Sequence, residues 1–207
     1  LKERQEMEEN LDILPKVGIE DVPSDISYAE KYAVTNKSIP LTSYSAGTNG
    51  IAYQQIVMPM PELTEEQMDL LPLYSTCVTE MAVGTRDYQQ TQLWHSSIVG
   101  AYSASASVRS DKDSLDKLHG TINFTSKGLA RNQQAMSELM QESLQLARFD
   151  ELPRLRELVS QIRTYRESSI TGSGHSLAMT AAASGLSASA YLSQRWGGMD
   201  GLVGIKA

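Results

Sequence analysis

The chain has 207 residues, of which 41% are hydrophobic and 21% charged, a composition that is ordinary for a globular protein and excludes a disordered or collagen-like chain. Its net charge of -7 arises from 25 acidic and 18 basic residues mixed along the sequence, so no concentrated basic field is present and nucleic acid is not an expected partner. No run approaches the roughly 20 consecutive apolar residues of a membrane span, which predicts a soluble protein without a membrane partner.

The N-terminal segment is polar and lacks an apolar face. Residues 1–12 are predicted to form the end of a charged helix that stops before Pro15, because proline disfavours helical geometry in the residue before it. Residues 15–27, with Gly18 and Pro23, predict an irregular linker. Since Leu1 stands in the middle of a helical pattern, we expect the sequence to be a segment of a longer protein.

Five stretches carry the short β-type patterns of strands. The first three precede and follow a Gly-Thr-Asn-Gly turn at 47–50, and the last two flank the polar turn Ser-Asp-Lys-Asp-Ser. The predicted strands are 28–35, 39–46, 51–61, 101–110 and 117–129.

Helical spacing of apolar residues dominates the remainder of the sequence. Thr64 and Gln67 form a capping-box signature at the start of a helix that is expected to run toward Gly84, with Pro72 bending or splitting it. The predicted helices are 64–84, 87–99, 130–147, 151–169, 174–185 and 187–196. Strands and helices that occur in runs predict an α+β fold, an antiparallel sheet with helices packed mainly on one face.

The residues that could carry chemistry are scattered. His95, His119 and His175 are isolated, and no two histidines have the spacing of four that places a pair of zinc ligands on one helical face. The serines lack a Gly-x-Ser-x-Gly elbow, so a Ser-His-Asp site has no anchor. The Gly-Ser-Gly-His segment before His175 could hold an anion at a helix start, but a turn between helices explains it better. These features predict no catalytic, cofactor-binding or metal-binding residue in the chain.

Other polar and reactive residues have ordinary explanations. Cys77, the single cysteine, lies in an apolar run and is expected to be a small buried side chain. The acidic pairs Glu65–Glu66 and Asp150–Glu151 stand at helix starts, where they compensate the helix dipole. A basic run interleaved with glutamates predicts a solvated helical face, or alternatively a contact with another domain. Its members are Arg148, Arg154, Arg156, Arg163 and Arg166.

Several segments, in order, resemble the second half of the presequence-protease branch of the pitrilysin/insulinase superfamily of zinc metallopeptidases. They include TNGIAYQQIVMPMPEL, LPLYSTCVTEMAVGTRDYQ, YSASASV, LHGTINFTSKGLARNQQAM and the tail from RFDELPRLRELV to AAASGLS. The resemblance covers residues 28 to 200, and the block from RESSITGSGH to AAASGLS is its most specific part.

The resemblance implies a parent protease with four homologous α+β domains, arranged as two halves that close around a chamber. This chain resembles the non-catalytic third domain. Residues 1–22 would then be the end of an interdomain helical hairpin and its linker, and 23–207 a single domain. In the catalytic domain of the family, a His-x-x-Glu-His helix precedes residues similar to Gly84, Thr85 and Tyr88.

The positions that correspond to the zinc motif are Ser75, Val78 and Thr79, and none of them is a metal ligand. The resemblance therefore implies zinc in the catalytic domain of the parent and no cofactor in this chain. The chain alone is expected to be inactive.

The leading hypothesis is a domain that helps to wall a peptide-digesting chamber and packs against the catalytic half. Its implied partners are the other domains of the same polypeptide and the peptide substrate, in the cytoplasm or an organelle matrix. Two alternatives stay open. One is a scaffold subunit of a proteolytically inactive homologue, and the other is a free-standing peptide-binding module with the methionine-rich helices as an adaptable groove.

Overall fold

The computed structural model describes residues 14–26, 28–36, 39–114 and 117–206, in two compact units, Leu1–Thr48 and Asn49–Ala207. In the first unit, a short 3-10 turn η2 (Ile19–Asp21) interrupts the expected linker, and β1 (Glu30–Asn36) pairs antiparallel with β2 (Ile39–Ser45). The helix expected at 1–12 lies outside the described residues.

The second unit contains a three-stranded antiparallel sheet in the order β3-β6-β5. Its strands are β3 (Ile51–Pro59), β5 (Ala101–Ser110) and β6 (Leu118–Leu129), close to the predicted ranges. The central strand is β6, which pairs with β3 through Ile56↔Phe124 and with β5 through Ala104↔Phe124. Phe124 therefore lies in the middle of the sheet.

The two faces of this sheet differ in what covers them. Successive side chains of a strand point to opposite faces. On β6, Ile122, Phe124 and Ser126 are buried, whereas the alternate residues Asn123 and Thr125 are half-buried. The same alternation runs along β3 and β5. One face thus carries the core. The other carries hydroxyl and amide side chains in its middle rows, with the exposed residues Tyr53, Val57, Lys127 and Arg109 among them.

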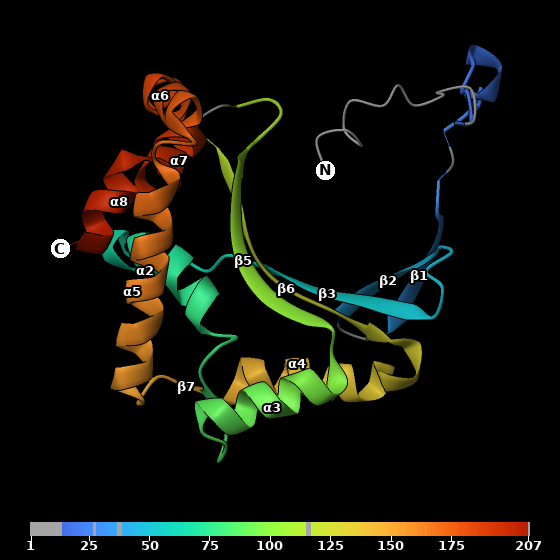
Figure 1. The fold of residues 1–207 in the computed structure, drawn as a ribbon, viewed down its shortest axis with the longest axis horizontal. Coiled ribbons are helices and arrows are strands. Elements are labelled where there is room, and N and C mark those ends of the chain that lie inside the picture. The colour runs from blue at the N-terminus through green and yellow to red at the C-terminus, as the bar shows by residue number, and fades with distance from the viewer. Residues whose placement is uncertain (1–13, 27, 37–38, 115–116, 207) are drawn as a thin grey trace, which may run out of the picture. The chain divides into compact units, whose positions relative to one another are not determined.

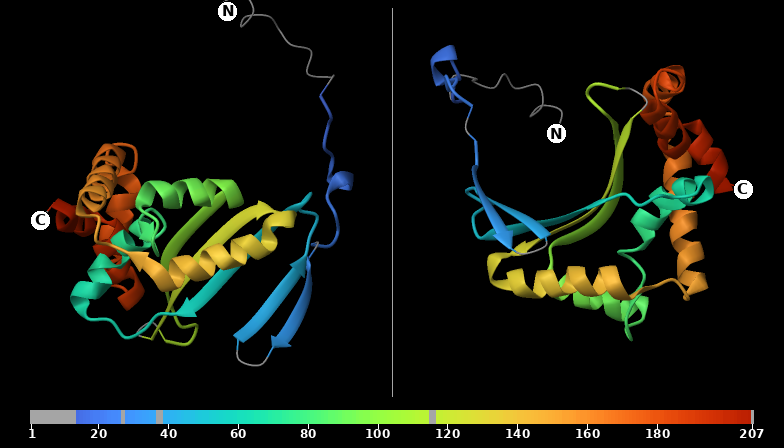
Figure 2. Two further views of the ribbon diagram at one scale, coloured as in Figure 1. Left: turned by 90° about the horizontal axis from the view of Figure 1, so that it is seen from below. Right: turned by 180° about the vertical axis from the view of Figure 1, so that it is seen from behind.

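Seven helices follow or separate these strands in the described residues. They are α2 (Glu65–Cys77), α3 (Tyr88–Ile98), α4 (Gln133–Leu146), α5 (Leu152–Ser169), α6 (Gly174–Ala183), α7 (Ala188–Gly197) and α8 (Met199–Lys206). Within the second unit, α3 and α4 lie side by side against one face of the sheet, and α2, α5, α7 and α8 gather beyond β5 (Figures 1 and 2). The predicted α+β fold is confirmed.

The core lies between the sheet and these helices. Phe124 of β6 packs in one cluster with Met136, Leu139 and Met140 of α4, all of them almost fully buried. Met81 belongs to a second buried cluster. Met81, Met136 and Met140 therefore belong to the hydrophobic core, and these three side chains form no exposed groove.

One helix end differs clearly from that predicted. The helix expected to run toward Gly84 ends at Cys77, and the chain then forms a two-residue strand β4 (Ala82–Val83) that pairs with β7 (Ala147–Arg148). The run from Val78 to Val83 is apolar enough to suggest a continuing helix, but it is buried and its backbone pairs with a distant segment. The backbone angle φ of Gly84 is 59°, a conformation that glycine adopts without strain.

The last helix, α8, was not predicted, because Gly197 and Gly198 signal a helix end. They do end α7, where the Gly198 amide donates to the carbonyl oxygens of Ser193 and Gln194. A new helix then begins at Met199 despite two internal glycines. A Cβ atom at Gly201 would stand only 2.5 Å from the Trp196 carbonyl oxygen, so the close approach of α8 to the end of α7 requires glycine there.

The capping box at Thr64 is confirmed, with the Gln67 amide 3.3 Å from the Thr64 Oγ1 atom. A second capping box starts α3, where the Gln90 amide donates to Asp87 Oδ1 at 2.8 Å. We expect Asp87→Ala to lower the free energy of unfolding by about 1 kcal/mol, because an amide of the first turn loses its acceptor. Asp87→Asn keeps an acceptor and should be nearly neutral in urea unfolding; equal losses for both variants would contradict the capping role.

Candidate functional site

The positions that the resemblance aligns with a zinc motif hold buried side chains that are not metal ligands. Ser75 lies on α2, and Val78 and Thr79 lie in the turn that follows it; all three are buried. Zinc in proteins is held by thiolate, imidazole or carboxylate groups, and these positions offer two hydroxyls and an isopropyl group. The residues therefore do not fit a zinc ion.

The downstream residues Gly84, Thr85 and Tyr88 have structural contacts. The Gly84 amide donates to the Leu146 carbonyl oxygen at 2.9 Å, which extends the β4–β7 pair. Thr85 stands in the turn closed by the bridge between Val83 and Arg86. The Tyr88 amide donates to Glu151 Oε2 at 3.0 Å, and the Arg154 guanidinium lies 4.8 Å from the centre of its ring.

The three histidines lie on separate elements. His95 is buried on α3, whereas His175 is exposed at the start of α6. His119 is exposed on β6, and its Nε2 atom lies 2.7 Å from Asp111 Oδ2 across the β5–β6 turn. In the described part of the chain, no three His, Cys, Asp or Glu side chains gather as a metal site would require.

His95 is the most perturbed of these groups. Its side chain is 6% exposed, and its ring meets the Tyr102 ring edge-on at 5.3 Å between centres. Burial, together with the nearby charge of Arg86, lowers the pKa of His95 to about 4. Burial also raises the pKa of Tyr102 to about 12. Both rings are neutral near neutral pH, and the pair serves packing between α3 and β5.

This lowered pKa predicts a loss of stability in mild acid. In the unfolded chain, His95 has its ordinary pKa of about 6.5 and is protonated below that pH. In the folded chain, the same side chain is protonated only near and below about pH 4. Between about pH 7 and about pH 5, the free energy of unfolding should fall by about 1 to 2 kcal/mol through this residue. Urea unfolding at both pH values measures the effect. His95→Gln should abolish this part of the fall and His119→Gln should keep it; an unchanged fall in His95→Gln would contradict the assignment.

Cys77 is buried at the end of α2, in contact with the Met81 and Leu158 cluster. Burial raises the pKa of its thiol above the ordinary value. Nucleophilic chemistry at cysteine requires the thiolate. The thiol therefore has neither the exposure nor the charge state of a reactive group, which confirms the interpretation as a small buried side chain.

Several residues of the predicted acidic pairs and basic run form ion pairs, some within a helix turn and some with distant segments. Glu65 contacts Arg195 of α7, and Glu151 accepts the Tyr88 amide. Arg154 bridges Glu80 and Glu157 at 3.2 and 2.9 Å. Two further ion pairs of the run are Arg148–Asp150 and Arg163–Glu167. These contacts support the prediction of a helical face with local ion pairs.

Arg166 departs from that prediction. Its Nη1 atom donates to the Trp196 carbonyl oxygen at 2.9 Å, so the guanidinium turns from α5 toward the C-terminal end of α7. Burial lowers the pKa of this guanidinium from its ordinary value. Among the described residues, no carboxylate lies within ion-pair distance of it.

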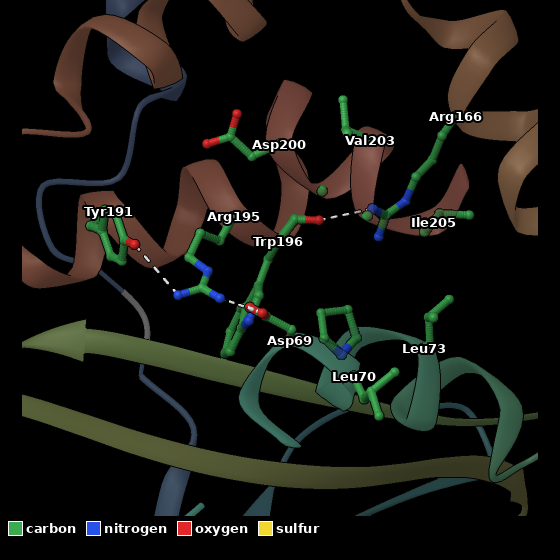
Figure 3. A pocket seen from close by; sticks show the side chains of 13 residues that line it. Asp69, Leu70, Leu73, Arg166, Tyr191, Arg195, Trp196, Asp200, Val203 and Ile205 are labelled. Atoms are coloured by element: carbon green, nitrogen blue, oxygen red, sulfur yellow. Dashed lines mark hydrogen bonds and ion pairs between the residues drawn. The ribbon is translucent and has the colours of Figure 1, made fainter. Parts of the chain in front are cut away.

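Arg166 lines a pocket of about 420 Å³ between α2, α5, α7 and α8 (Figure 3). Leu70 and Leu73 of α2 and Val203 and Ile205 of α8 supply much of the apolar lining. Sequence reasoning missed this pocket because α8 was not predicted. The sequence carried no signal for it, because Arg166 stands in the same basic run as Arg163, which is exposed and paired with Glu167.

Within the described part of the chain, every helix is too short or too polar to cross a lipid bilayer. The chain matches, over residues 1–207, the model of a family described as associated with peptidases of family M16, subfamily C.

Curated relatives include presequence proteases of several organisms. The chain is 30% identical to the mitochondrial presequence protease of Danio rerio, over 90% of the chain and 18% of the relative. It is 30% identical to that of Yarrowia lipolytica, over 90% of the chain and 19% of the relative. It is 26% identical to the chloroplastic/mitochondrial presequence protease 1 of Arabidopsis thaliana, over 93% of the chain and 18% of the relative. The chain therefore spans about a fifth of the length of the relatives it matches.

Proposed function

Since the chain belongs to this peptidase-associated family, we propose that it is a non-catalytic domain of a zinc metalloendopeptidase that degrades peptides in an enclosed chamber. The relatives are named as presequence proteases and are about five times as long as the region they share with this chain. The remaining length is sufficient for catalytic and further domains. The other domains of that polypeptide are the proposed partners, and an organelle matrix is the proposed compartment.

In this proposal the domain contributes a surface that lines the chamber, and it carries out no reaction of its own. The observation that carries this role is the cover of the β3-β6-β5 sheet by helices on one face (Figure 2), while the middle rows of the opposite face carry no charged side chain. Gln55, Thr125 and Ser103 stand in one of these cross-strand rows, and Val57, Asn123 and Ser105 stand in the next. The charged residues Lys127 and Arg109 stand toward the two ends of the same face. Hydroxyl and amide groups hold water and contact extended peptides without selecting one charge. This is the surface that we propose as a chamber wall.

The residues at Ser75, Val78 and Thr79 do not fit zinc, so the proposal places the metal in a different domain of the parent. Hydrolytic zinc requires three protein ligands, an open position for water and a nearby base. This domain supplies none of these groups at the corresponding positions. Its contribution is to limit which substrates reach the metal by enclosing them.

The wall role can be tested by size-selective labelling of a single cysteine. Ser105→Cys places a thiol on the sheet face that no described helix covers, and Gln161→Cys places one on an exposed position of α5. In the isolated chain, both thiols should react with N-ethylmaleimide and with a maleimide carried on a long polyethylene glycol. Cys77 is buried and should stay unlabelled.

In the parent protein, stripped of its other accessible cysteines, Ser105→Cys should react with the small reagent and resist the large one. Equal labelling of Ser105→Cys by the large reagent in the parent and in the isolated chain would contradict an enclosed wall. Gln161→Cys is the control, because its thiol lies on α5 and outside the sheet face.

A further inference from the structure

The pocket between α2, α5, α7 and α8 combines charged side chains, among them Arg166, with an apolar lining. Figure 3 shows Arg166 reaching from α5 toward the Trp196 carbonyl oxygen, with Leu70 and Leu73 of α2 and Ile205 of α8 around the same space. The pocket volume of about 420 Å³ lies in the range of small-molecule sites. It is large enough for a dipeptide.

Two charged groups of this lining, Arg166 and Asp200, have no ion-pair partner among the described residues. Arg195, which lines the same pocket, is neutralised by Glu65 and Asp69. Arg166 has five N–H donors and, among the described residues, one acceptor, the Trp196 carbonyl oxygen. A planar guanidinium matches the two oxygens of a carboxylate. The pocket therefore favours a ligand with a carboxylate beside an apolar group.

Two further features restrict the charge of that ligand. The carbonyl oxygen of Trp196 belongs to the last turn of α7, where a helix carries partial negative charge, and Asp200 of α8 adds a full one. Both disfavour a doubly charged anion such as a phosphate group. Asp200 instead suits a protonated amine. A zwitterion meets both requirements, with its carboxylate on Arg166 and its ammonium group toward Asp200.

We propose that this pocket binds a short peptide with free termini and an apolar C-terminal side chain, held by its carboxylate on Arg166. The apolar side chain lies among Leu70, Leu73 and Ile205. Peptides of this kind are the products that any peptidase releases. The site nevertheless stands whether or not the chain helps to wall a chamber, because its residues all belong to this chain.

Gly204 allows the pocket to be filled without touching Arg166. It lies on α8 and lines the pocket, and a Cβ atom built there meets nothing within 4 Å. Gly204→Leu therefore occupies open space, and it replaces a poor helix former by a good one. The variant should fold and lose binding. Arg166→Gln removes the charge directly, and Arg163→Gln is the matched control one turn earlier on α5.

The test is a titration of the 207-residue chain with the dipeptide Ala-Leu, followed by the indole N–H signals of its two tryptophans in NMR spectra. Trp196 lines the pocket and Trp94 does not. We expect the Trp196 signal to shift and the Trp94 signal to stay. Binding should weaken by about tenfold or more in Arg166→Gln and in Gly204→Leu, and stay unchanged in Arg163→Gln.

Two further probes separate the ligand classes. Ala-Leu with an amidated C-terminus lacks the carboxylate, and octanoate lacks the ammonium group; both should bind about tenfold more weakly than Ala-Leu. The proposal is overturned if Trp196 does not respond to Ala-Leu, if the amide or octanoate binds as well as the dipeptide, or if Gly204→Leu binds normally. Where Arg166→Gln fails to fold, Gly204→Leu decides the outcome.

Discussion

Replacing Phe124 by alanine is expected to lower the free energy of unfolding by about 4 kcal/mol. Phe124 is 1% exposed at the centre of β6, and it packs against Met136, Leu139 and Met140 of α4. Its removal leaves a cavity that the sheet and α4 can fill only by moving closer together, which close packing of the rest of the core resists. Urea unfolding followed by circular dichroism measures the change.

Tyr53→Ala is the matched control for this prediction. Tyr53 belongs to the neighbouring strand β3 and points to the opposite face, where it is 62% exposed. Its loss should cost less than about 1 kcal/mol. Similar losses for the two aromatic residues would show that both faces of the sheet are covered, which the fold described above does not allow.

The second large loss of stability is expected when Trp196, which connects α7 to α2, is replaced. Its indole Nε1 atom donates to the Met68 carbonyl oxygen at 2.9 Å, and its ring packs against the main core cluster. Trp196→Ala should lower the free energy of unfolding by about 3 kcal/mol through lost packing. Trp196→Phe keeps most of the ring and should lose about 1 kcal/mol through the missing hydrogen bond.

The neighbouring aromatic residue Tyr191 supplies a control on the same helix. It is half-exposed, and Tyr191→Ala should cost less than about 1 kcal/mol in the same urea experiment. If Trp196→Ala costs no more than Tyr191→Ala, then the contact between α7 and α2 does not stabilise the domain.

Most of the fold could be predicted from the sequence because its signals are local. Alternation along 101–110 and 117–129 predicted β5 and β6, and the capping pair Thr64 and Gln67 predicted the start of α2. Such patterns depend on neighbours within a few residues. The sequence therefore predicted the order of these elements along the chain.

The errors lie where a distant segment decides the local structure. The strand β4 exists because Ala82 and Val83 pair with β7, which begins 64 residues beyond Val83 in the chain (147 less 83). The helix α8 forms although Gly201 and Gly204 disfavour it, because its backbone packs against the end of α7. Helix propensity is a weak preference that such packing overrides.

The pocket at Arg166 could not be predicted for the same reason. Its residues come from four helices, one of which was not predicted, and the arginine stands in a run of which three other members, Arg148, Arg154 and Arg163, form ion pairs. Spacing along α5 does not distinguish an arginine that faces water from one that turns toward another helix end. The distinction required the position of the Trp196 carbonyl oxygen.

Our proposal of a structural, non-catalytic role rests on Ser75, Val78 and Thr79, the residues at the positions that the resemblance aligns with a zinc motif. The most direct test is the zinc content of the purified 207-residue chain after dialysis against micromolar zinc, together with its peptide hydrolysis. We predict zinc well below one ion per chain and hydrolysis at background. One tightly bound zinc ion per chain, with hydrolysis that a chelator abolishes, would contradict this assignment.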